Sequence, residues 1–289
     1  MNRPAAVAGS WYPDHPSHLA ADIDRYLGEA TVESPSRLPC ALVAPHAGLM
    51  YSGPVAAFAY TLVRGVPYHA VVLVGPSHFV PFRGVSIWGA GQWETPLGAV
   101  AVDITLAEMV RAECADVVDL PAAHRREHAL EMQLPFSAHL LPGVPIVPLV
   151  MGDQTRYTAF ALGDALAAAC RVRDVSVGRV PLETEAIESG PANVLLIASS
   201  DLSHYEDAAV AARMDAIVIR HIEALDPDGL MDALEREPRH ACGGGPMVAV
   251  LRAARERGAS DARVLRYADS GDVSGDKSSV VGYLAAAAW

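Results

Sequence analysis

Two stretches of this chain decide its fold: Ala41-Leu-Val-Ala-Pro-His46 and Val71-Val-Leu-Val-Gly-Pro-Ser-His78. Each begins as a short, nearly continuous apolar run, which is typical of a strand in a sheet that is covered on both faces. Each ends with a proline that is followed closely by a histidine. In open α/β sheets, ligands bind outside the carboxyl ends of the strands. The repeated pattern therefore predicts a buried sheet that presents His46 and His78 in one place.

Strand and helix patterns alternate along the rest of the chain, which predicts a layered α/β fold. No internal repeat or linker divides the sequence, so we expect a single domain over residues 1–289. Residues 174–192 are polar, contain Gly and Pro and lack a clean period, and we interpret them as a surface insertion. The expected strands are 40–44, 70–75, 85–88, 99–102, 146–150, 193–199, 263–267 and 280–285, and the expected helices are 53–64, 104–113, 127–141, 155–173, 207–225, 229–237 and 246–258.

The composition limits the class of protein. Hydrophobic residues make up 51% of the 289 residues, and the net charge is -12 without a cluster of Lys or Arg, which argues against a nucleic-acid or anionic-membrane surface. The sequence has no apolar run with the length of a signal segment or a membrane span. Its four cysteines are scattered without a CxxC pair, as is common in a reducing compartment. We therefore expect a cytoplasmic protein that binds neither nucleic acid nor membrane.

A glycine loop adds a third candidate ligand to the two histidines. Cys242 opens the sequence Cys-Gly-Gly-Gly-Pro before an expected helix, with Gly243 next to it. Two imidazoles and a soft thiol form a three-ligand set that leaves a metal ion with an open face. The start of a helix also favours the thiolate form, because its free backbone N–H groups lower the pKa of a nearby thiol. Alternatively, Cys242 is a structural cysteine at a helix entry.

A third buried strand, residues 193–199, ends in the polar sequence Ser199-Ser-Asp-Leu-Ser-His204. Asp201 and His204 are three residues apart, so one turn can bring both into the same pocket. An imidazole near a metal ion can act as a general acid or base, and a carboxylate can orient it. We expect these two residues to act in this way, with Ser200 beside them. The alternative is that Ser200 and Asp201 only cap the next helix.

The segment 127–141 contributes two further candidates for the pocket. In a helix, His128 and Glu131 occupy positions i and i+3 and share a face. Such a pair could line a metal pocket, or it could be an ordinary hydrogen-bonding pair. The sequence HExxH is absent, which argues against a zincin-type protease.

Taken together, these motifs resemble the MEMO family, which includes the prokaryotic AmmeMemoRadiSam system protein B. They keep one order from residue 9 almost to the C-terminus, so the resemblance covers nearly the whole chain. That family is similar in fold to the class III extradiol (LigB-type) dioxygenases, which implies a central mixed β-sheet flanked by helices. The residues that carry the resemblance are Gly9-Ser-Trp-Tyr12, Ala44-Pro-His-Ala-Gly48, Gly75-Pro-Ser-His78, Glu127-His128, Glu131-Met132, Leu134-Pro135, Ser199-Ser-Asp-Leu-Ser-His204, Cys242-Gly243 and Ser278-Ser-Val280.

The resemblance also implies a function for the pocket. It implies a metal ion held by His46, His78 and Cys242, with His204 as the acid/base residue; we expect iron or copper first and zinc as the alternative. The related dioxygenases hold non-haem iron with two histidines and a carboxylate. A thiolate in the third position is softer and can itself oxidise, so their activity does not carry over with the fold. The family name implies a functional association with a radical-SAM protein and an AMMECR1-like protein.

The motifs are compatible with three functions. The first is a non-haem, dioxygenase-like metal-dependent oxidoreductase, with Asp201 and His128 as outer partners of the ligands. The second is a non-enzymatic module that binds a small molecule or a peptide in the same pocket. The third is a zinc hydrolase, since two histidines, a cysteine and a water form a catalytic zinc set. An aromatic rim for the second function could come from Trp11, Tyr12, Trp88 and Trp93.

Overall fold

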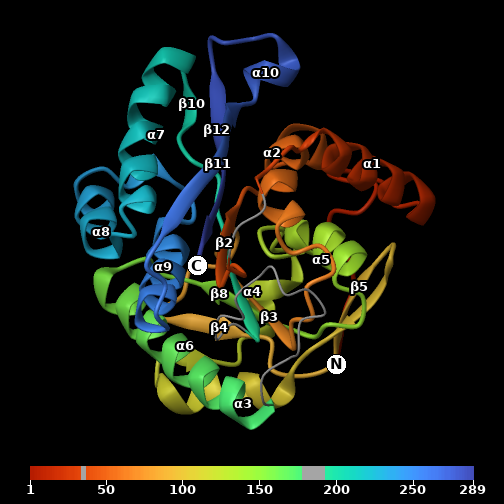
Figure 1. Ribbon diagram of the computed structural model, residues 1–289, viewed down its shortest axis with the longest axis vertical. Helices are drawn as coiled ribbons and strands as arrows, with labels where there is room; N and C mark the ends of the chain where they lie inside the picture. The colour runs from red at the N-terminus through yellow and green to blue at the C-terminus, as the bar shows by residue number, and fades with distance from the viewer. Residues whose placement is uncertain (34–36, 178–192) are drawn as a thin grey trace.

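A mixed β-sheet forms the centre of the molecule (Figure 1). The computed structural model describes residues 1–33, 37–177 and 193–289. In this part of the chain the sheet has nine strands in the order β10-β12-β2-β9-β3-β8-β4-β7, with β11 paired to β12. The strands are β2 (Ala41–Ala44), β3 (Ala70–Pro76), β4 (Val85–Ile87), β7 (Val117–Val118), β8 (Ile146–Met151), β9 (Val194–Ser199), β10 (His204–Glu206), β11 (Ala262–Asp269) and β12 (Val280–Ala288).

The four central strands, β2, β9, β3 and β8, are parallel, and β12 and β4 flank them in antiparallel orientation. Every residue of the four is buried, as their continuous apolar sequences predict. Side chains alternate between the two faces, so that Ala41 and Val43 pack in one core and Leu42 and Ala44 in the other. Because β2, β3 and β9 run the same way, the chain leaves all three at the same edge of the sheet.

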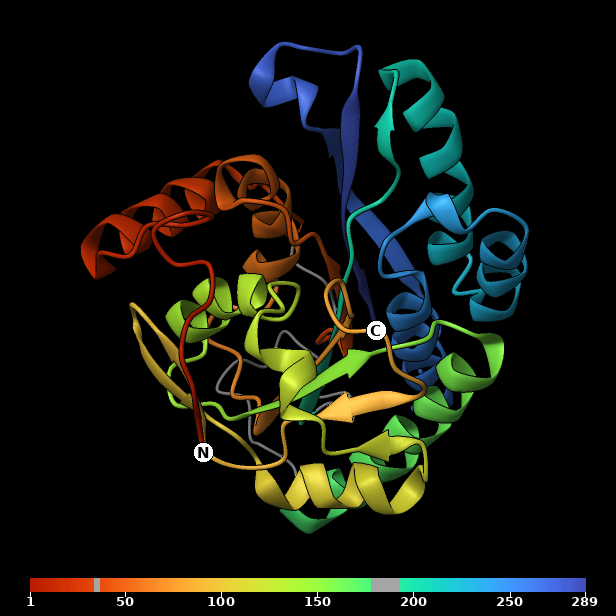
Figure 2. The same ribbon diagram turned by 180° about the vertical axis from the view of Figure 1, so that it is seen from behind.

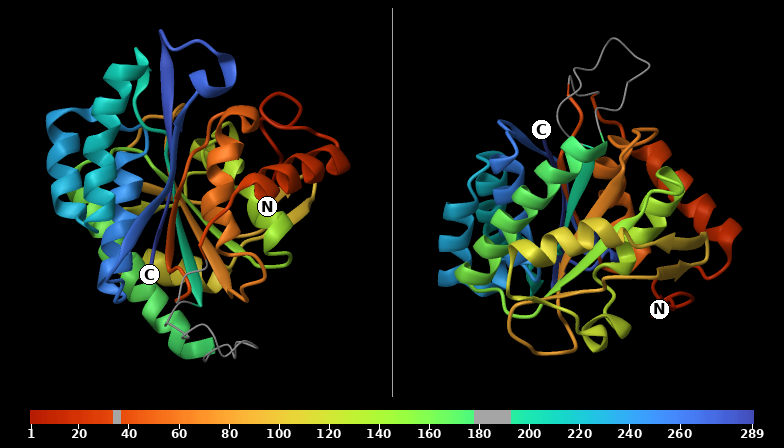
Figure 3. Two further views of the ribbon diagram at one scale, coloured as in Figure 1. Left: turned by 45° about the horizontal axis from the view of Figure 1, so that its top comes forward. Right: turned by 90° about the horizontal axis from the view of Figure 1, so that it is seen from below.

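Helices cover both faces of the sheet (Figure 3). In one layer α9 lies on β9, β3 and β2, and in the other layer α2 lies on β2 and β12. This arrangement confirms the expected α/β fold with a central mixed sheet flanked by helices. The first layer contains α3 (Ile104–Glu113), α6 (Arg156–Val177), α7 (Ala208–Glu223), α8 (Pro227–Arg236) and α9 (Gly244–Glu256), and the second contains α1 (Pro16–Glu29), α2 (Leu49–Thr61) and α5 (Leu134–Leu140).

A small sheet at the side of the molecule holds the N-terminus (Figure 2). In it β1 (Asn2–Arg3) is parallel to β5 (Gln92–Thr95), and β6 (Gly98–Ala101) is antiparallel to β5. The sequence predicts a strand near β6 but neither β1 nor β5, since such short runs show too little periodicity. From this sheet the N-terminal segment continues to Trp11, which lies at the carboxyl edge of the central sheet.

The expected helix over 127–141 is wrong in its first part. The chain is irregular after α4 (Pro121–Arg125) and becomes helical again only at a 3₁₀ turn before α5. Buried Glu127 explains the break, because its carboxylate accepts hydrogen bonds from the backbone N–H groups of His78 at 2.6 Å and Ala129 at 2.9 Å. These bonds hold the chain away from a helical path.

The expected surface insertion, residues 174–192, begins with helical residues. The helix α6 runs to Val177, and Asp174 forms an ion pair with Arg257 at 3.1 Å that ties this last turn to the end of α9. Residues 178–192 lie outside the described part of the chain. Among the helices that the structure describes, none is long and apolar enough to cross a membrane. The remaining short elements are α10 (Gly271–Ser274), η1 (Glu131–Gln133) and η2 (Pro238–His240).

Candidate metal centre

A pocket of about 410 Å³ lies where β2, β3 and β9 end. This is the edge at which α/β sheets bind ligands. The structure brings the three expected metal ligands and the expected acid/base pair to its wall. The lining residues are Trp11, His46, Ala47, His78, His128, Asp201, His204, Tyr205, Cys242 and Val281.

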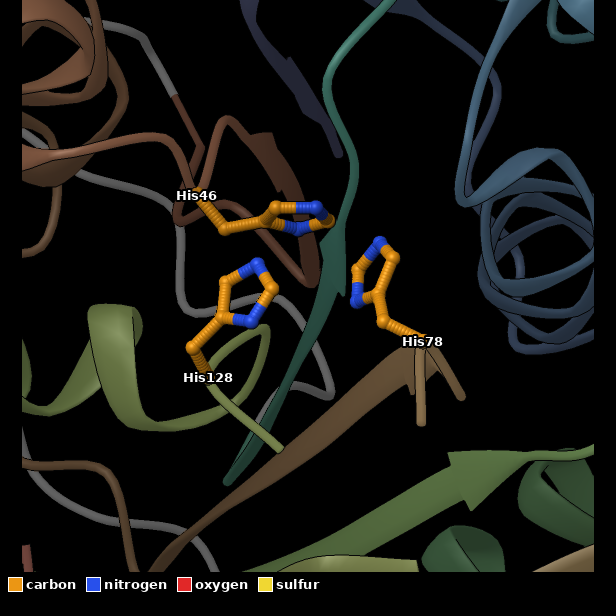
Figure 4. Close-up of side chains that lie close together, drawn as sticks. All are labelled: His46, His78 and His128. Carbon is orange, nitrogen blue, oxygen red and sulfur yellow. The ribbon is translucent and has the colours of Figure 1, made fainter. Parts of the chain in front are cut away.

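Three histidines converge in this pocket (Figure 4). One ring nitrogen from each of His46, His78 and His128 lies within 4.8 Å of the other two. His46 follows β2, His78 follows β3, and His128 lies in the irregular stretch after α4. The sequence placed His128 in a helix beside the pocket, whereas the structure places its ring with the two strand-end histidines. Three side chains at these distances could hold one metal ion.

The tautomer of buried His46 follows from its neighbours. The hydroxyl of Ser199 donates its one proton to the carbonyl of Ala129 at 2.6 Å, so it accepts from Nδ1–H of His46 at 3.0 Å. Nε2 of His46 therefore presents a lone pair to the pocket. Burial, together with the nearby imidazole of His78, lowers the pKa of His46 to about 3, and the ring is neutral near pH 7. A neutral ring with a free nitrogen is the form that binds metals.

His78 is held by the carboxylate of Glu127. Nδ1 of the ring lies 2.8 Å from Oε1, and the backbone N–H donates to Oε2 at 2.6 Å. Burial would raise the pKa of Glu127, but hydrogen bonds from His78 and Ala129 outweigh it and lower the pKa to about 2. The ionised carboxylate accepts from Nδ1–H and leaves Nε2 of His78 free. A carboxylate behind a histidine is common at metal sites, because it orients the ring and raises its basicity.

His128 differs from the other two because its Nδ1 has no hydrogen-bond partner among the described residues. This atom is buried, and Oε1 of Glu127 lies 3.6 Å away. The ring stacks on His78 with centroids 4.6 Å apart and contacts Trp11 with centroids 4.3 Å apart. Burial, together with the nearby imidazole of His46, lowers the pKa of His128 to about 4. One ring nitrogen of His128 lies within 4.8 Å of those of His46 and His78, so this ring could join them at a metal ion.

Cys242 meets the histidines through His46. Its Sγ lies 3.2 Å from Nε2 of His46 and accepts a hydrogen bond from the backbone N–H of Asp201 at 3.3 Å. Burial, together with the carboxylate of Asp201, raises the pKa of Cys242 well above that of an ordinary thiol. The sequence predicts that the start of a helix lowers the pKa of Cys242, and this prediction is wrong for the metal-free protein. The helix α9 begins only at Gly244, and the effect of burial dominates. The thiol would have to lose its proton in order to bind a metal ion.

Asp201 and His204 face the pocket with separate partners. Oδ1 of Asp201 accepts from the backbone N–H groups of His46 at 2.7 Å and Ala47 at 3.3 Å, so this buried carboxylate fixes the His46 turn. Nδ1 of His204 lies 2.8 Å from the carbonyl oxygen of Leu202, which can only accept. Nδ1 therefore carries the proton and Nε2 is free. The backbone, rather than Asp201, orients the ring of His204.

Ser200 and Gly243 lie behind the pocket, where they join two loops. The backbone N–H of Gly243 donates to Oγ of Ser200 at 2.9 Å, and this hydroxyl donates to the carbonyl of Asp201 at 2.7 Å. The alternative that Ser200 and Asp201 cap the next helix is wrong, since the side chain of Asp207 caps α7 by accepting from the N–H of Ala209. Ser200 and Gly243 instead hold the thiol-bearing loop against the end of β9.

Glu131 lies outside the pocket and acts on it through the N-terminal segment. It is fully buried, pairs with Arg3 at 2.7 Å, and accepts from the hydroxyl of Tyr12 at 2.6 Å and from two backbone N–H groups. These bonds fix the segment that carries Trp11, whose ring packs on His128. The expected pair of His128 and Glu131 on one helix face is therefore wrong, because the two side chains point to different partners.

The aromatic rim also differs from the expected one. Tyr12, Trp88 and Trp93 are buried in the core, whereas Trp11 lines the pocket. Tyr205 joins it at the pocket wall, where it is 78% exposed and adopts a left-handed backbone conformation with a φ of 62°. No pattern in the sequence indicates this position for Tyr205.

Sequence reasoning missed the groups that hold the two strand-end rings. Glu127 orients His78 and Ser199 orients His46, yet neither contact was expected. The contact of Glu127 could have been anticipated, because a carboxylate in a segment that becomes buried needs hydrogen-bond donors nearby. Ser199 has no comparable signal.

The donors of the pocket fit a transition metal ion. Imidazole nitrogens and a thiol suit iron, copper and zinc, whereas magnesium and calcium prefer oxygen ligands. Among the described residues, ring nitrogens of His46, His78 and His128 lie within 4.8 Å of one another, and Sγ of Cys242 lies 3.2 Å from Nε2 of His46 without belonging to that group.

Comparisons with known proteins agree with the motifs. The model of the Memo-like protein family matches residues 3–180 and 181–287. A MEMO1 family protein of Thermotoga maritima is 38% identical over 297 residues, which cover 99% of each chain. The MEMO1 family protein MTH_45 of Methanothermobacter thermautotrophicus is 39% identical over 293 residues, which cover 98% of this chain and 99% of the relative. The crystal structure of the uncharacterized protein JW3007 from Escherichia coli K12 shares the fold, with a TM-score of 0.54 and 16% identity over 86% of this chain and 99% of that one. By the family model and these full-length relatives, the chain belongs to the MEMO family.

Proposed function

We propose that the protein binds iron or copper in this pocket through His46, His78 and Cys242 and uses it in redox chemistry. The observation that supports the proposal most directly is the position of His46. Its Nε2, which carries no proton, lies 3.2 Å from Sγ of Cys242, and one of its ring nitrogens lies within 4.8 Å of those of His78 and His128. Two nitrogen donors and one thiol would then face an open pocket.

Different residues would serve metal binding and proton transfer. Glu127 and Ser199 orient the rings of His78 and His46 so that the free nitrogens are available for coordination. A bound iron or copper ion would supply the one-electron chemistry that the side chains lack. His204, with a free Nε2 at the pocket wall, could accept or donate a proton at a bound molecule.

His128 is the candidate for an additional ligand. Its ring nitrogen lies in the same group and is neutral near pH 7, so it could bind an ion without losing a proton. Cys242 differs in this respect, because its thiol must first be deprotonated. The variants His128→Asn and Cys242→Ser would therefore show which of the two side chains completes the site.

The metal content of protein purified without oxygen tests the proposal. We expect bound iron or copper in the wild type, a sharp loss in His46→Ala and Cys242→Ser, and near-normal content in His204→Asn, whose defect should be confined to activity. Equal loss in His204→Asn would make His204 a ligand. Zinc in place of iron or copper, with hydrolysis of ester substrates, would favour the zinc hydrolase.

Oxygen uptake with a panel of catechols tests the kind of redox chemistry. The thiol occupies the position where the ring-cleaving enzymes keep a carboxylate, so we expect little ring-opened product from the iron-loaded protein. Rapid ring opening, detected by absorbance, would contradict this expectation and favour an ordinary extradiol dioxygenase.

A second candidate function is recognition of a small molecule or peptide without catalysis. It is favoured by Trp11 and Tyr205, whose large side chains are exposed at the pocket. Fluorescence polarisation with aromatic peptides, measured on metal-loaded and metal-depleted protein, separates the two functions. Tight binding that depends on Trp11 but not on the metal would support this candidate.

A further inference from the structure

The loop that carries Cys242 is held from its far side by Gln154. The side-chain amide of Gln154 donates from Nε2 to the carbonyl of Cys242 at 2.7 Å and accepts through Oε1 from the N–H of Gly245 at 2.7 Å. We infer that Gln154 is a positioning residue that sets where the thiol lies relative to His46. The inference rests on the proposed role of Cys242 as a metal ligand.

These two hydrogen bonds, the Gln154 clamp, fix the orientation of the amide. A backbone carbonyl can only accept and a backbone N–H can only donate, so the amide nitrogen must face Cys242 and the amide oxygen must face Gly245. One side chain thus joins the thiol-bearing residue to the first turn of α9 and closes the loop between them. Residues 243–245 are all glycine, so the loop itself has no side chain that could make these bonds.

The glycines allow the loop to pass close to its neighbours. A Cβ on Gly245 would lie 2.9 Å from Cβ of Gln154 and 2.6 Å from Sδ of Met151. A Cβ on Gly243 would lie 2.5 Å from the carbonyl oxygen of Ser199. Such distances are shorter than real contacts of a Cβ atom, so only glycine lets the loop approach Gln154 on one side and the end of β9 on the other.

A cavity of about 320 Å³ borders the clamp. Its lining includes Gln154, Leu234, Ala241 and Gly244, so it lies directly beside the loop. Packing restrains a segment only where atoms fill the space around it. On this side the two hydrogen bonds therefore supply much of the restraint. Without them the loop could shift into the cavity and move Sγ of Cys242 away from His46.

The anchors on the opposite side of the loop come from the end of β9. The backbone N–H of Cys242 donates to the carbonyl of Asp201 at 3.2 Å, and Sγ accepts from the N–H of Asp201 at 3.3 Å. Next along the loop, the backbone N–H of Gly243 donates to Oγ of Ser200 at 2.9 Å. The loop is thus held between two sets of anchors, and we expect the loss of the Gln154 clamp, which lies on the side of the cavity, to let the loop shift and release the thiol.

Two variants test the inference with Co(II) as the probe. Gln154→Met keeps the approximate volume of the side chain but removes both hydrogen bonds. Gln154→Glu keeps the acceptor for Gly245 but places an oxygen against the carbonyl of Cys242. We expect each variant to weaken Co(II) binding by roughly tenfold and to reduce the thiolate-to-cobalt absorption band at saturating Co(II). The matched control is Gln92→Met on β5 in the small sheet, which should change neither quantity.

Alkylation of metal-free protein gives a second measurement that does not depend on a bound ion. Release of the loop should expose the thiol, so iodoacetamide should modify Cys242 several-fold faster in Gln154→Met than in the wild type. Cys40, Cys114 and Cys170 are buried and serve as internal controls in the same mass spectra. Equal acceleration at all four cysteines would mean that the variant loosens the whole fold, and it would overturn a specific role for Gln154.

Unchanged cobalt bands and unchanged alkylation rates in both variants would also overturn the inference. A defect in Gln154→Glu alone would do the same, since it would come from the added charge rather than from loss of the clamp. A failure of the proposed function itself would give a different result, which is seen in the wild type. If the wild type itself shows no thiolate-to-cobalt band, Cys242 is not a ligand, and the alkylation rates alone then decide whether Gln154 holds the loop.

Discussion

The two walls of the pocket are built in different ways. The histidine wall, His46 and His78, is held by Ser199 and Glu127 through hydrogen bonds that fix which ring nitrogen carries the proton. The thiol wall, the glycine loop that carries Cys242, is held through its backbone by the side chains of Ser200 and Gln154, and it borders a cavity. The protein therefore presents its nitrogen donors ready for coordination, whereas the thiol must be deprotonated and is positioned through the backbone of its loop.

This difference suggests separate contributions to metal binding. A ligand that is already oriented and carries a free lone pair loses little freedom on coordination, so the histidine wall should supply most of the affinity. A thiol is softer and more easily oxidised than an imidazole, so the thiol wall should affect the choice of metal and its redox behaviour more strongly. The following predictions test that division.

Loss of His46 should have the largest effect. His46→Ala removes the ring whose Nε2 lies 3.2 Å from the thiol and which converges with His78 and His128. We expect the affinity for Co(II) to fall by more than the roughly 10–100-fold that is typical when an outer partner of a ligand is lost. Calorimetric titration of the wild type, His46→Ala and Cys242→Ser measures the difference. A greater loss in Cys242→Ser than in His46→Ala would reverse the comparison of the two walls.

Loss of the carboxylate behind His78 should have the next largest effect. In Glu127→Gln the ring of His78 loses a charged acceptor, and the NH2 of the amide must face either the ring Nδ1 or the backbone N–H of His78. We expect Co(II) affinity to fall by about 10–100-fold, the usual range for such partners. The matched control is Glu94→Gln, an exposed residue on β5. Unchanged affinity in Glu127→Gln would show that the histidine wall does not depend on its hydrogen bonds.

The same comparison shows why only part of the site could be predicted from the sequence. The positions of His46 and His78 follow from local features, namely an apolar run, a proline and a histidine, and the central sheet follows from the same runs. Glu127 and Gln154 act on residues that are 49 and 88 positions away in the chain. No local pattern encodes contacts over such separations, so the roles of Glu127 and Gln154 were not expected, whereas Asp201 was expected as an outer partner of the ligands.

The segment after α4 shows how long-range contacts can also change local structure. Its sequence favours a helix over 127–141, yet Glu127 binds two backbone N–H groups and the chain stays irregular around His128. Tertiary hydrogen bonds of a buried charge thus outweigh helix propensity, which amounts to a few tenths of a kcal/mol per residue, roughly. The ring of His128 reaches the other histidines because that helix does not form.

Oxidation of Cys242 tests the thiol wall. The raised pKa keeps the thiol protonated near pH 7, and the thiolate is the form that oxidises. We expect Cys242 to stay reduced when metal-free protein stands in air and to form sulfenic or higher acids after iron loading, as mass spectrometry of the peptide would show. Buried Cys170 is the control and should stay reduced in both samples. Equal oxidation of Cys242 in both would mean that the protein alone activates the thiol.

The smallest effect is expected at Tyr205, which belongs to neither wall. Its φ of 62° is unfavourable for a residue with a side chain, and β10 has an irregular register at this point. Glycine adopts such a conformation without strain, although it also has more freedom in the unfolded chain. Because the side chain is exposed, little packing is lost on truncation. We expect Tyr205→Gly to be more stable than Tyr205→Ala by about 1 kcal/mol in urea denaturation, since alanine keeps the strain. Equal stability would mean that the strand relaxes once the tyrosine is removed, and that the ring itself holds the backbone in its left-handed conformation beside His204.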